Sequence, residues 1–134
     1  MRQPLTDQRD MSDLNTPILL LATAHPDKAI EFYRDVLGLR LTADEQWALV
    51  FDIGGVMLRI QKVDRVADAQ YTVMGWAVAD ISQTVADLAT RGVAFQQYPH
   101  LPQDEQGIWS TPDGAKIAWF QDPDGNTLSL TQHP

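Results

Sequence analysis

Two stretches of the chain follow the same order of structural patterns, and this internal repeat constrains the fold more than any other feature. Each stretch begins with an apolar strand pattern, at residues 17–24 and 71–78, and continues into a helical pattern that ends at a glycine. A shift of 55 residues places Ile30 of the first helical pattern on Val85 of the second. A repeat of this kind indicates one supersecondary unit that occurs twice. The sequence therefore predicts two similar modules rather than one undivided core.

Both helical patterns carry signals for where a helix begins and ends. The first runs from Pro26 to Leu37, because proline is favoured at the first position of a helix. Gly38 follows, and glycine readily adopts the left-handed conformation that ends a helix. Asp80 is a good N-terminal cap for the second helix, which Gly92 ends. We therefore expect one amphipathic helix in each module.

Each helix is followed by an extended segment and a hairpin. The extended segments are expected at 39–42 and 93–96, and the hairpin strands at 47–52, 56–61, 116–121 and 127–131. The hairpin turns contain glycine or asparagine, which tolerate the backbone angles of tight turns. The predicted fold class is therefore α+β, with two βαβββ modules and a mainly antiparallel sheet. The domain organisation that we expect is a flexible tail at 1–15 and modules at about 16–63 and 70–132.

Charge and composition exclude several classes of partner. The chain has 18 Asp and Glu residues against 10 Lys and Arg residues, and its formal net charge is −8. Such a surface repels phosphate backbones and anionic lipids, so we expect neither nucleic-acid nor membrane binding. The longest apolar run, Ile18 to Ala22, is far too short to span a bilayer. The chain has no cysteine, which excludes disulfides and thiolate metal sites and fits a cytoplasmic protein.

Two strings within the modules resemble a known family. Residues 29–39 (AIEFYRDVLGL) and 119–130 (WFQDPDGNTLSL) are similar to the signature stretches of the vicinal oxygen chelate superfamily, which contains glyoxalases, bleomycin-resistance proteins and extradiol dioxygenases. The resemblance covers about residues 16–132. It implies that paired modules form a cupped sheet around one cavity for a small molecule, and that the protein is a homodimer. Because the superfamily includes both enzymes and non-catalytic binders, the fold does not settle the activity.

The resemblance also implies a divalent metal held by His, Gln or Glu side chains on the first and last strand of each module. The matching positions in this chain are Ile18, Arg59, Val73 and Ser129. Two of them are aliphatic and one is a cation, so the set lacks the oxygen and imidazole donors that such a metal requires. The histidines lie apart from these positions, and we expect surface or capping roles for His25, His100 and His133. We therefore expect no metal and no other cofactor.

The alternation of side chains along the strands predicts which residues face the cavity. One set is expected to pack under the helices: Leu19, Leu21, Met74, Trp76 and Val78. The alternate set is expected to face the cavity: Ile18, Leu20, Ala22, Val73, Gly75 and Ala77. On the hairpin strands, alternation gives Met57, Arg59, Gln61, Thr127 and Ser129 as ligand-binding residues. Core packing accounts for most of the hairpin aromatics, and Trp119 is the ring that we add to the ligand-binding residues, as one that can stack on a planar ligand. Together, these residues describe an apolar pocket with a few polar groups, which is typical of a small-molecule site.

Arg59 has two interpretations. Its planar guanidinium can pair with a carboxylate, phosphate or enolate-like oxygen of a ligand. It can equally pair with an acidic neighbour such as Asp52, or extend to solvent. The long loop at 98–107 also has two interpretations, as a lid over a site or as a solvated crossover, and its polar composition favours the crossover.

Three classes of function follow from these observations. The first is a metal-free module that binds and sequesters a small organic molecule. The second is a metal-dependent lyase or dioxygenase, which needs ligands that this sequence lacks. The third is a metal-independent enzyme in which Arg59 or Ser129 stabilises developing negative charge. The sequence favours the first class, then the third, then the second.

Overall fold

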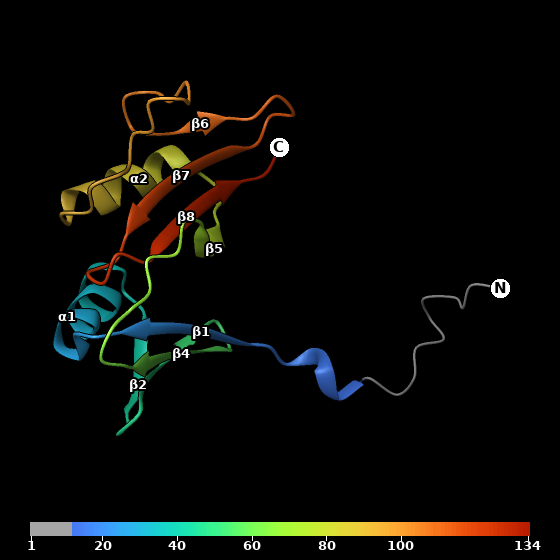
Figure 1. Ribbon diagram of the computed structural model, residues 1–134. Helices are drawn as coiled ribbons and strands as arrows, with labels where there is room; N and C mark the ends of the chain where they lie inside the picture. The colour runs from blue at the N-terminus through green and yellow to red at the C-terminus, as the bar shows by residue number, and fades with distance from the viewer. Residues whose placement is uncertain (1–11) are drawn as a thin grey trace.

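The computed structural model describes residues 12–134, and it confirms an α+β fold of two βαβββ modules (Figure 1). The first module consists of β1 (Ile18–Thr23), α1 (Pro26–Ile30), β2 (Arg40–Asp44), β3 (Ala48–Ile53) and β4 (Val56–Lys62). The second consists of β5 (Thr72–Ala77), α2 (Ile81–Thr90), β6 (Trp109–Ser110), β7 (Lys116–Gln121) and β8 (Thr127–Gln132). Most of the expected tail lies outside the described residues; Ser12–Asn15 form a short 3₁₀ turn that stands clear of both modules.

The strands form two four-stranded sheets with the same topology. The order is β1-β4-β3-β2 in the first sheet and β5-β8-β7-β6 in the second. In each sheet the first strand of the module pairs in parallel with the last, and the other pairs are antiparallel. The helix of each module lies in the long connection that such a parallel pair requires, together with the other two strands of the module. No helix among residues 12–134 has the length and apolar character needed to cross a membrane.

The first helix begins as expected at Pro26 but changes its winding after one turn. Residues Glu31–Val36 form a π-helical segment, in which the Leu37 amide donates to the carbonyl of Phe32, five residues earlier, at 2.9 Å. This winding coincides with a fully buried Tyr33 on the segment. Gly38 then adopts φ = 77°, which confirms its role in ending the helix.

The second helix begins and ends where the sequence indicates. Asp80 caps it by accepting a hydrogen bond from the Gln83 amide at 3.1 Å, and Gly92 follows its end with φ = 95°. The buried face of α2 consists of Ile81, Val85 and Leu88. In Figure 1 this helix lies against one face of the second sheet.

The expected strand at 93–96 is wrong. Only Phe95 forms a bridge, to Phe120, and the two-residue strand β6 takes the remaining edge of the sheet. The side-chain amide of Gln103 donates to the Gln96 carbonyl at 2.8 Å, so a loop contact replaces a ladder bond at this point. The pattern of apolar residues at 93–96 does not indicate this contact, because it depends on how the following loop folds back.

The turn between β7 and β8 carries hydrogen bonds that link the two modules. This turn lies beside the end of β1 and the start of α1 (Figure 1). Asp122 accepts a hydrogen bond from the buried Tyr33 hydroxyl at 2.6 Å, and the Asn126 amide donates to the Ala22 carbonyl at 3.0 Å. Asp124 accepts from the Ala24 amide at 2.9 Å. Around this joint, one hydrophobic core runs through both modules.

Candidate functional site

The predicted ligand-binding residues are divided between the two sheets. Met57, Arg59 and Gln61 alternate along β4 in the first sheet, whereas Trp119, Thr127 and Ser129 lie on β7 and β8 in the second. Trp119 and Ser129 are direct partners across the two strands. Within residues 12–134, no hydrogen bond or ion pair links one set to the other.

The expected pattern of inward and outward side chains holds at most positions. Leu21 and Met74 are buried in the core, and Ile18 and Leu20 are 51% and 59% exposed. Val73 is the exception: it is partly buried against the core. The strand pairing shifts between Thr72 and Met74, and such an irregularity interrupts the alternation that placed Val73 in the cavity.

The four positions that would hold the family's metal do not fit one. Ile18 and Val73 carry no donor atom, and the guanidinium of Arg59 is a permanent cation that repels a dication. The region 12–134 contains no group of three or more His, Cys, Asp or Glu side chains that could hold a metal. His25 instead occupies the cap position of α1, where its Nδ1 lies 3.1 Å from Asp124.

Arg59 pairs with an acidic neighbour that sequence reasoning did not name. Its Nη1 donates to Glu45 Oε1 at 3.3 Å, rather than to Asp52. The Arg59 side chain is 33% exposed and that of Glu45 is 52% exposed. A long bond between two partly solvated groups is weak, so Arg59 remains accessible to an anion.

The exposed face of the first sheet is largely apolar around Arg59. Ile18, Leu20 and Met57 lie on adjacent strands β1 and β4 and are all exposed. Trp47, just before β3, is 71% exposed. Ile18, Leu20 and Met57 form an exposed apolar patch of the kind that marks an interface. Trp47 lies opposite Lys62, at a position that alternates to the other face of the sheet.

The second sheet carries a pocket lined by aromatic rings. Trp119 is its central ring: Trp109 stacks beside it with ring centroids 6.2 Å apart, and Tyr98 meets it edge-on at 5.5 Å. His100 lies 6.0 Å from Tyr98. The aromatic pocket has a volume of about 460 Å³ and is lined by Asp68, Ala69, Gln70, Tyr71, Thr72, Gln96, Tyr98, His100, Leu101, Trp119, Gln121 and Thr127. Trp119 and Thr127 are two of the residues that the sequence predicted.

An ordered loop builds one wall of the aromatic pocket. The Gln103 side chain accepts from the Tyr98 amide at 2.6 Å and donates to the carbonyls of Gln96 and Gly107 at 2.8 and 2.7 Å. Asp104 accepts two further bonds from backbone amides of the same loop, each 2.9 Å long. These contacts fix the backbone of the loop at Tyr98. Sequence reasoning missed the rings of Tyr98 and His100, and their only signal was their position in the long loop.

Strands β5 and β8 approach closely at Gly75. Gly75 lies opposite Ser129, and a Cβ atom at Gly75 would collide with the Ser129 hydroxyl and lie 2.9 Å from its carbonyl oxygen. Only glycine fits this contact without displacing the neighbouring strand. The Ser129 hydroxyl therefore lies over an uncovered stretch of backbone.

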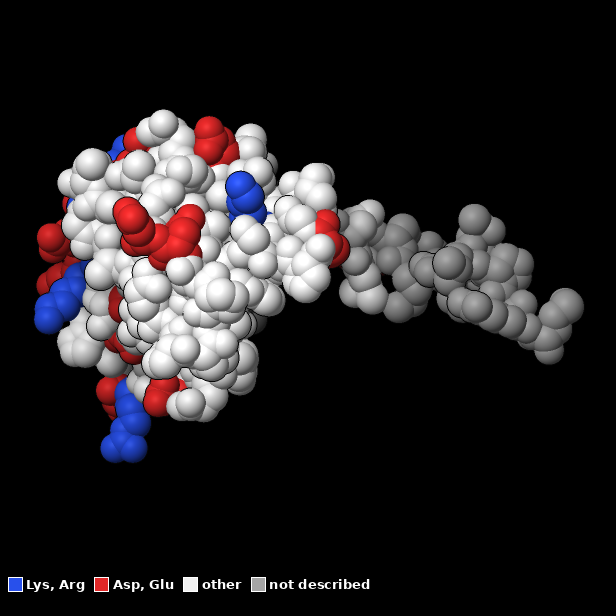
Figure 2. All heavy atoms as spheres, turned by 90° about the horizontal axis from the view of Figure 1, so that it is seen from above, with Lys and Arg blue, Asp and Glu red and all other residues white. Residues whose placement is uncertain are grey.

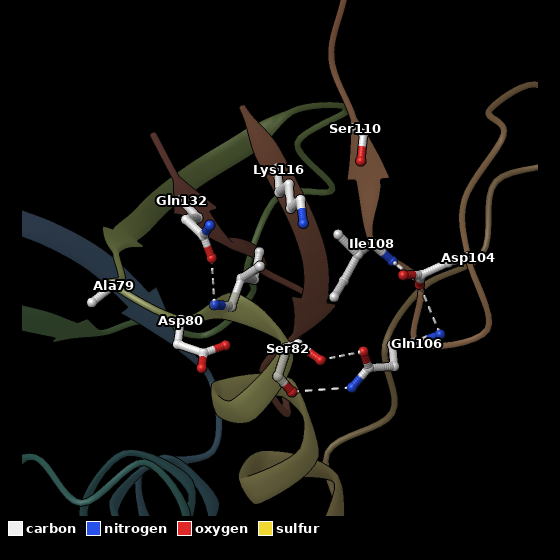
Figure 3. A pocket seen from close by; sticks show the side chains of 10 residues that line it. Ala79, Asp80, Ser82, Asp104, Gln106, Ile108, Ser110, Lys116 and Gln132 are labelled. Carbon is white, nitrogen blue, oxygen red and sulfur yellow. Dashed lines mark hydrogen bonds between the residues drawn. The ribbon is translucent and has the colours of Figure 1, made fainter. Parts of the chain in front are cut away.

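A second pocket, of about 450 Å³, lies at the start of α2 and is shown in Figure 3. Its polar groups mostly bind one another. Ser82 and Gln106 exchange two hydrogen bonds of 2.8 and 3.0 Å, and Gln132 accepts from the Ile81 amide at 2.9 Å. The Ser82–Gln106 bonds fasten the 98–107 loop to α2, and the Gln132 bond fastens β8 to it, so we assign this pocket a structural role.

Basic side chains are scarce on one face of the molecule and absent from the lining of the aromatic pocket. On the face that Figure 2 shows, Lys and Arg side chains are few and lie mostly near the outline of the molecule. The aromatic pocket is lined by one carboxylate, Asp68, and by neither Lys nor Arg. An anionic ligand would find no cation there.

Comparisons with known proteins agree with this geometry. The model of the Glyoxalase/Bleomycin resistance protein/Dioxygenase superfamily matches residues 17–130. The chain is 28% identical over 118 residues to the uncharacterized protein YraH of Bacillus subtilis, with 77% of this chain and 86% of YraH covered. It is 27% identical over 108 residues to the metallothiol transferase FosB of Staphylococcus haemolyticus, covering 77% of this chain and 72% of FosB.

Solved structures show the same fold. A superfamily member from Sphaerobacter thermophilus superimposes with a TM-score of 0.68 at 21% identity, and the match covers 90% of this chain and 99% of that one. At this level of identity the likeness establishes the arrangement of strands and helices, while the function depends on the site.

Proposed function

This chain belongs to the Glyoxalase/Bleomycin resistance protein/Dioxygenase superfamily, and we propose that it binds a small organic molecule in its aromatic pocket without a bound metal. The observation that carries this proposal is the group of rings around Trp119, which stands beside Thr127 in a pocket of about 460 Å³. A pocket of this size with aromatic walls and a few amides and hydroxyls suits a drug-sized molecule. Sequestration of that molecule is then the function.

The donor set supports binding without a metal. The superfamily's metal positions hold Ile18, Arg59, Val73 and Ser129, and at most the hydroxyl of Ser129 could serve as a weak ligand. FosB, a relative at 27% identity, is named a metallothiol transferase. We propose that this chain differs from such a protein in its chemistry while keeping the fold.

We also propose that the protein is a cytoplasmic homodimer. The apolar patch on the first sheet, which consists of Ile18, Leu20 and Met57, supports a second copy as its cover. The lack of cysteine supports a reducing compartment. Sedimentation analysis of the purified protein tests whether it is a dimer. A Leu20→Glu variant should shift the monomer–dimer equilibrium towards the monomer.

A metal-independent enzyme is the second candidate. Arg59 has one long ion pair, and the Ser129 hydroxyl lies over Gly75 with no side chain above that backbone. Either group could stabilise negative charge that develops on a bound substrate. Turnover of a bound compound, abolished in Arg59→Ala or Ser129→Ala, favours this candidate; unchanged recovery of every bound compound favours sequestration.

The binding proposal is tested by a ligand screen that follows tryptophan fluorescence and confirms hits by calorimetry. We expect flat organic molecules to bind the wild-type protein and to bind Trp119→Leu at least about tenfold more weakly, since stacking on the ring is lost. Trp47→Leu is the matched control, because Trp47 is exposed outside the pocket. Equal binding by Trp119→Leu and wild type would overturn the proposal that ligands bind in the aromatic pocket. A transition metal present in stoichiometric amount in the purified protein would overturn the proposal that binding is metal-free.

A further inference from the structure

The rings of the aromatic pocket lie in different planes and so select for shape. Of the lining rings, Tyr98 stands at 78° to Trp119. Trp109, which does not line the pocket, stacks on Trp119 with an angle of 26° between the planes. A flat molecule can stack on one ring while its edge meets the face of another. The Gln103 side chain fixes the backbone that carries Tyr98, so little ordering of the loop is needed when a ligand binds.

The charge of the residues that line the pocket favours one sign of charge on the ligand. Among the lining residues, Asp68 is the one acidic side chain, and no Lys or Arg is present. The other polar groups of the lining include neutral amides and hydroxyls. The Gln70 amide donates to Asp68 Oδ2 at 3.0 Å, which orients the carboxylate but leaves its charge in place. In the described part of the chain, Asp68 forms no ion pair.

The aromatic faces act in the same direction. The face of a Trp or Tyr ring attracts a cation, and this attraction strengthens where water is excluded. The net charge of −8 adds a long-range attraction for cations. Arg59, the cation that the sequence placed in the cavity, lies on the other sheet and pairs with Glu45.

We infer that the ligand of the aromatic pocket is a flat aromatic molecule that carries a positive charge. This inference rests on the proposed function and adds the chemical class of the molecule bound. The rings supply stacking, Asp68 supplies the counter-charge, and the amides of Gln70, Gln96 and Gln121 supply hydrogen bonds at the edge of the ligand.

Three acridines of one shape test the inference by calorimetry in a mildly alkaline buffer of low salt. They are the N-methylacridinium cation, neutral acridine and the acridine carboxylate anion. We expect the cation to bind at least about threefold more tightly than acridine, and the anion to bind most weakly. Equal affinity for the cation and for acridine would overturn the inference and leave the proposed function intact. If no molecule in the wider screen binds, the proposed function itself fails.

Two variants locate the charge and the ring. Asp68→Asn should lower the affinity for the cation about threefold and leave that for acridine unchanged, because only the ion pairing is removed. Glu31→Gln, an identical charge change at an exposed position on the first module, should change neither affinity. Tyr98→Leu should lower the affinity for both the cation and acridine. Unaltered cation binding by Asp68→Asn would contradict the role of the carboxylate, and thermal unfolding confirms that each variant is folded.

Discussion

The Tyr33 hydroxyl donates a 2.6 Å hydrogen bond to Asp122 Oδ2 across the boundary between the two modules. Both side chains are buried, and the Asn126 side-chain amide donates to the same carboxylate oxygen at 2.8 Å. Asp122 Oδ1 accepts from the backbone amides of Asp124 and Asn126. Residues 122–126 therefore form more than the turn of a hairpin, because this turn also fastens the second module to the first helix.

Removal of this hydrogen bond should destabilise the whole domain. Tyr33→Phe keeps the ring but leaves a buried carboxylate with one donor fewer, which costs about 1–3 kcal/mol. Urea unfolding measures this loss, with Tyr71→Phe as the control because Tyr71 is largely exposed. If both variants unfold at the wild-type midpoint, the joint does not depend on the Tyr33 hydroxyl.

The same pair predicts a loss of stability in alkali. Burial, followed by the charge and hydrogen bond of Asp122, raises the pKa of the Tyr33 phenol far above its ordinary value of about 10. Because the folded state holds this proton more tightly, the stabilisation is complete below about pH 10 and is lost as the pH rises above it. The free energy of unfolding of the wild type should therefore fall across this range, and that of Tyr33→Phe should fall less.

Asp124 predicts the opposite dependence in acid. Burial raises its pKa, but hydrogen bonds from Thr23, the Ala24 amide and His25, together with the charge of His25, outweigh burial and hold the pKa below its usual value. The stabilisation is therefore present above the unfolded-state pKa of about 4 and is lost as the pH falls through the lowered value. Asp124→Asn should show a smaller loss of stability in acid than the wild type. Asp64→Asn, at an exposed position, should follow the wild-type curve.

Local signals explain how much of the fold could be predicted from the sequence. The cap at Asp80, the stop at Gly38 and the hairpin β7–β8 each depend on residues that are close together in the chain, and all three were placed correctly. The π-helical winding at 31–36 and the two-residue strand β6 depend on tertiary contacts, so no periodicity indicates them.

The candidate site was predicted less completely for the same reason. Strand alternation placed Thr127 on the face that carries the aromatic pocket, and Trp119 was named as a hairpin ring that can line a cavity. The wall that holds Tyr98 depends on Gln103, whose partners are selected by the path of a loop rather than by a pattern. Likewise, the partner of Arg59 is Glu45, which reaches it from beyond the end of β2.

Gly75 should be intolerant of even a methyl group. In Gly75→Ala, the new Cβ would lie 2.9 Å from the Ser129 carbonyl oxygen, and backbone on a central strand cannot move as a flexible side chain can. We expect a destabilisation of about 1–3 kcal/mol by overpacking, measured by thermal or urea unfolding. Removing the hydroxyl in a Gly75→Ala, Ser129→Ala double variant should restore only part of this loss, because the carbonyl remains. Full restoration would show that the hydroxyl alone sets the limit.

Arg59 separates the two candidate functions. Its pair with Glu45 is partly exposed and 3.3 Å long, so Arg59→Ala should change the free energy of unfolding by less than about 1 kcal/mol. If the protein only sequesters a cation in the aromatic pocket, Arg59→Ala should leave the affinity for N-methylacridinium unchanged, because Arg59 lies on the other sheet. If Arg59 binds an anionic substrate, this variant should instead lose affinity for the acridine carboxylate. Calorimetry with both probes on one protein sample distinguishes these outcomes, and Arg40→Ala, at another exposed arginine, is the control.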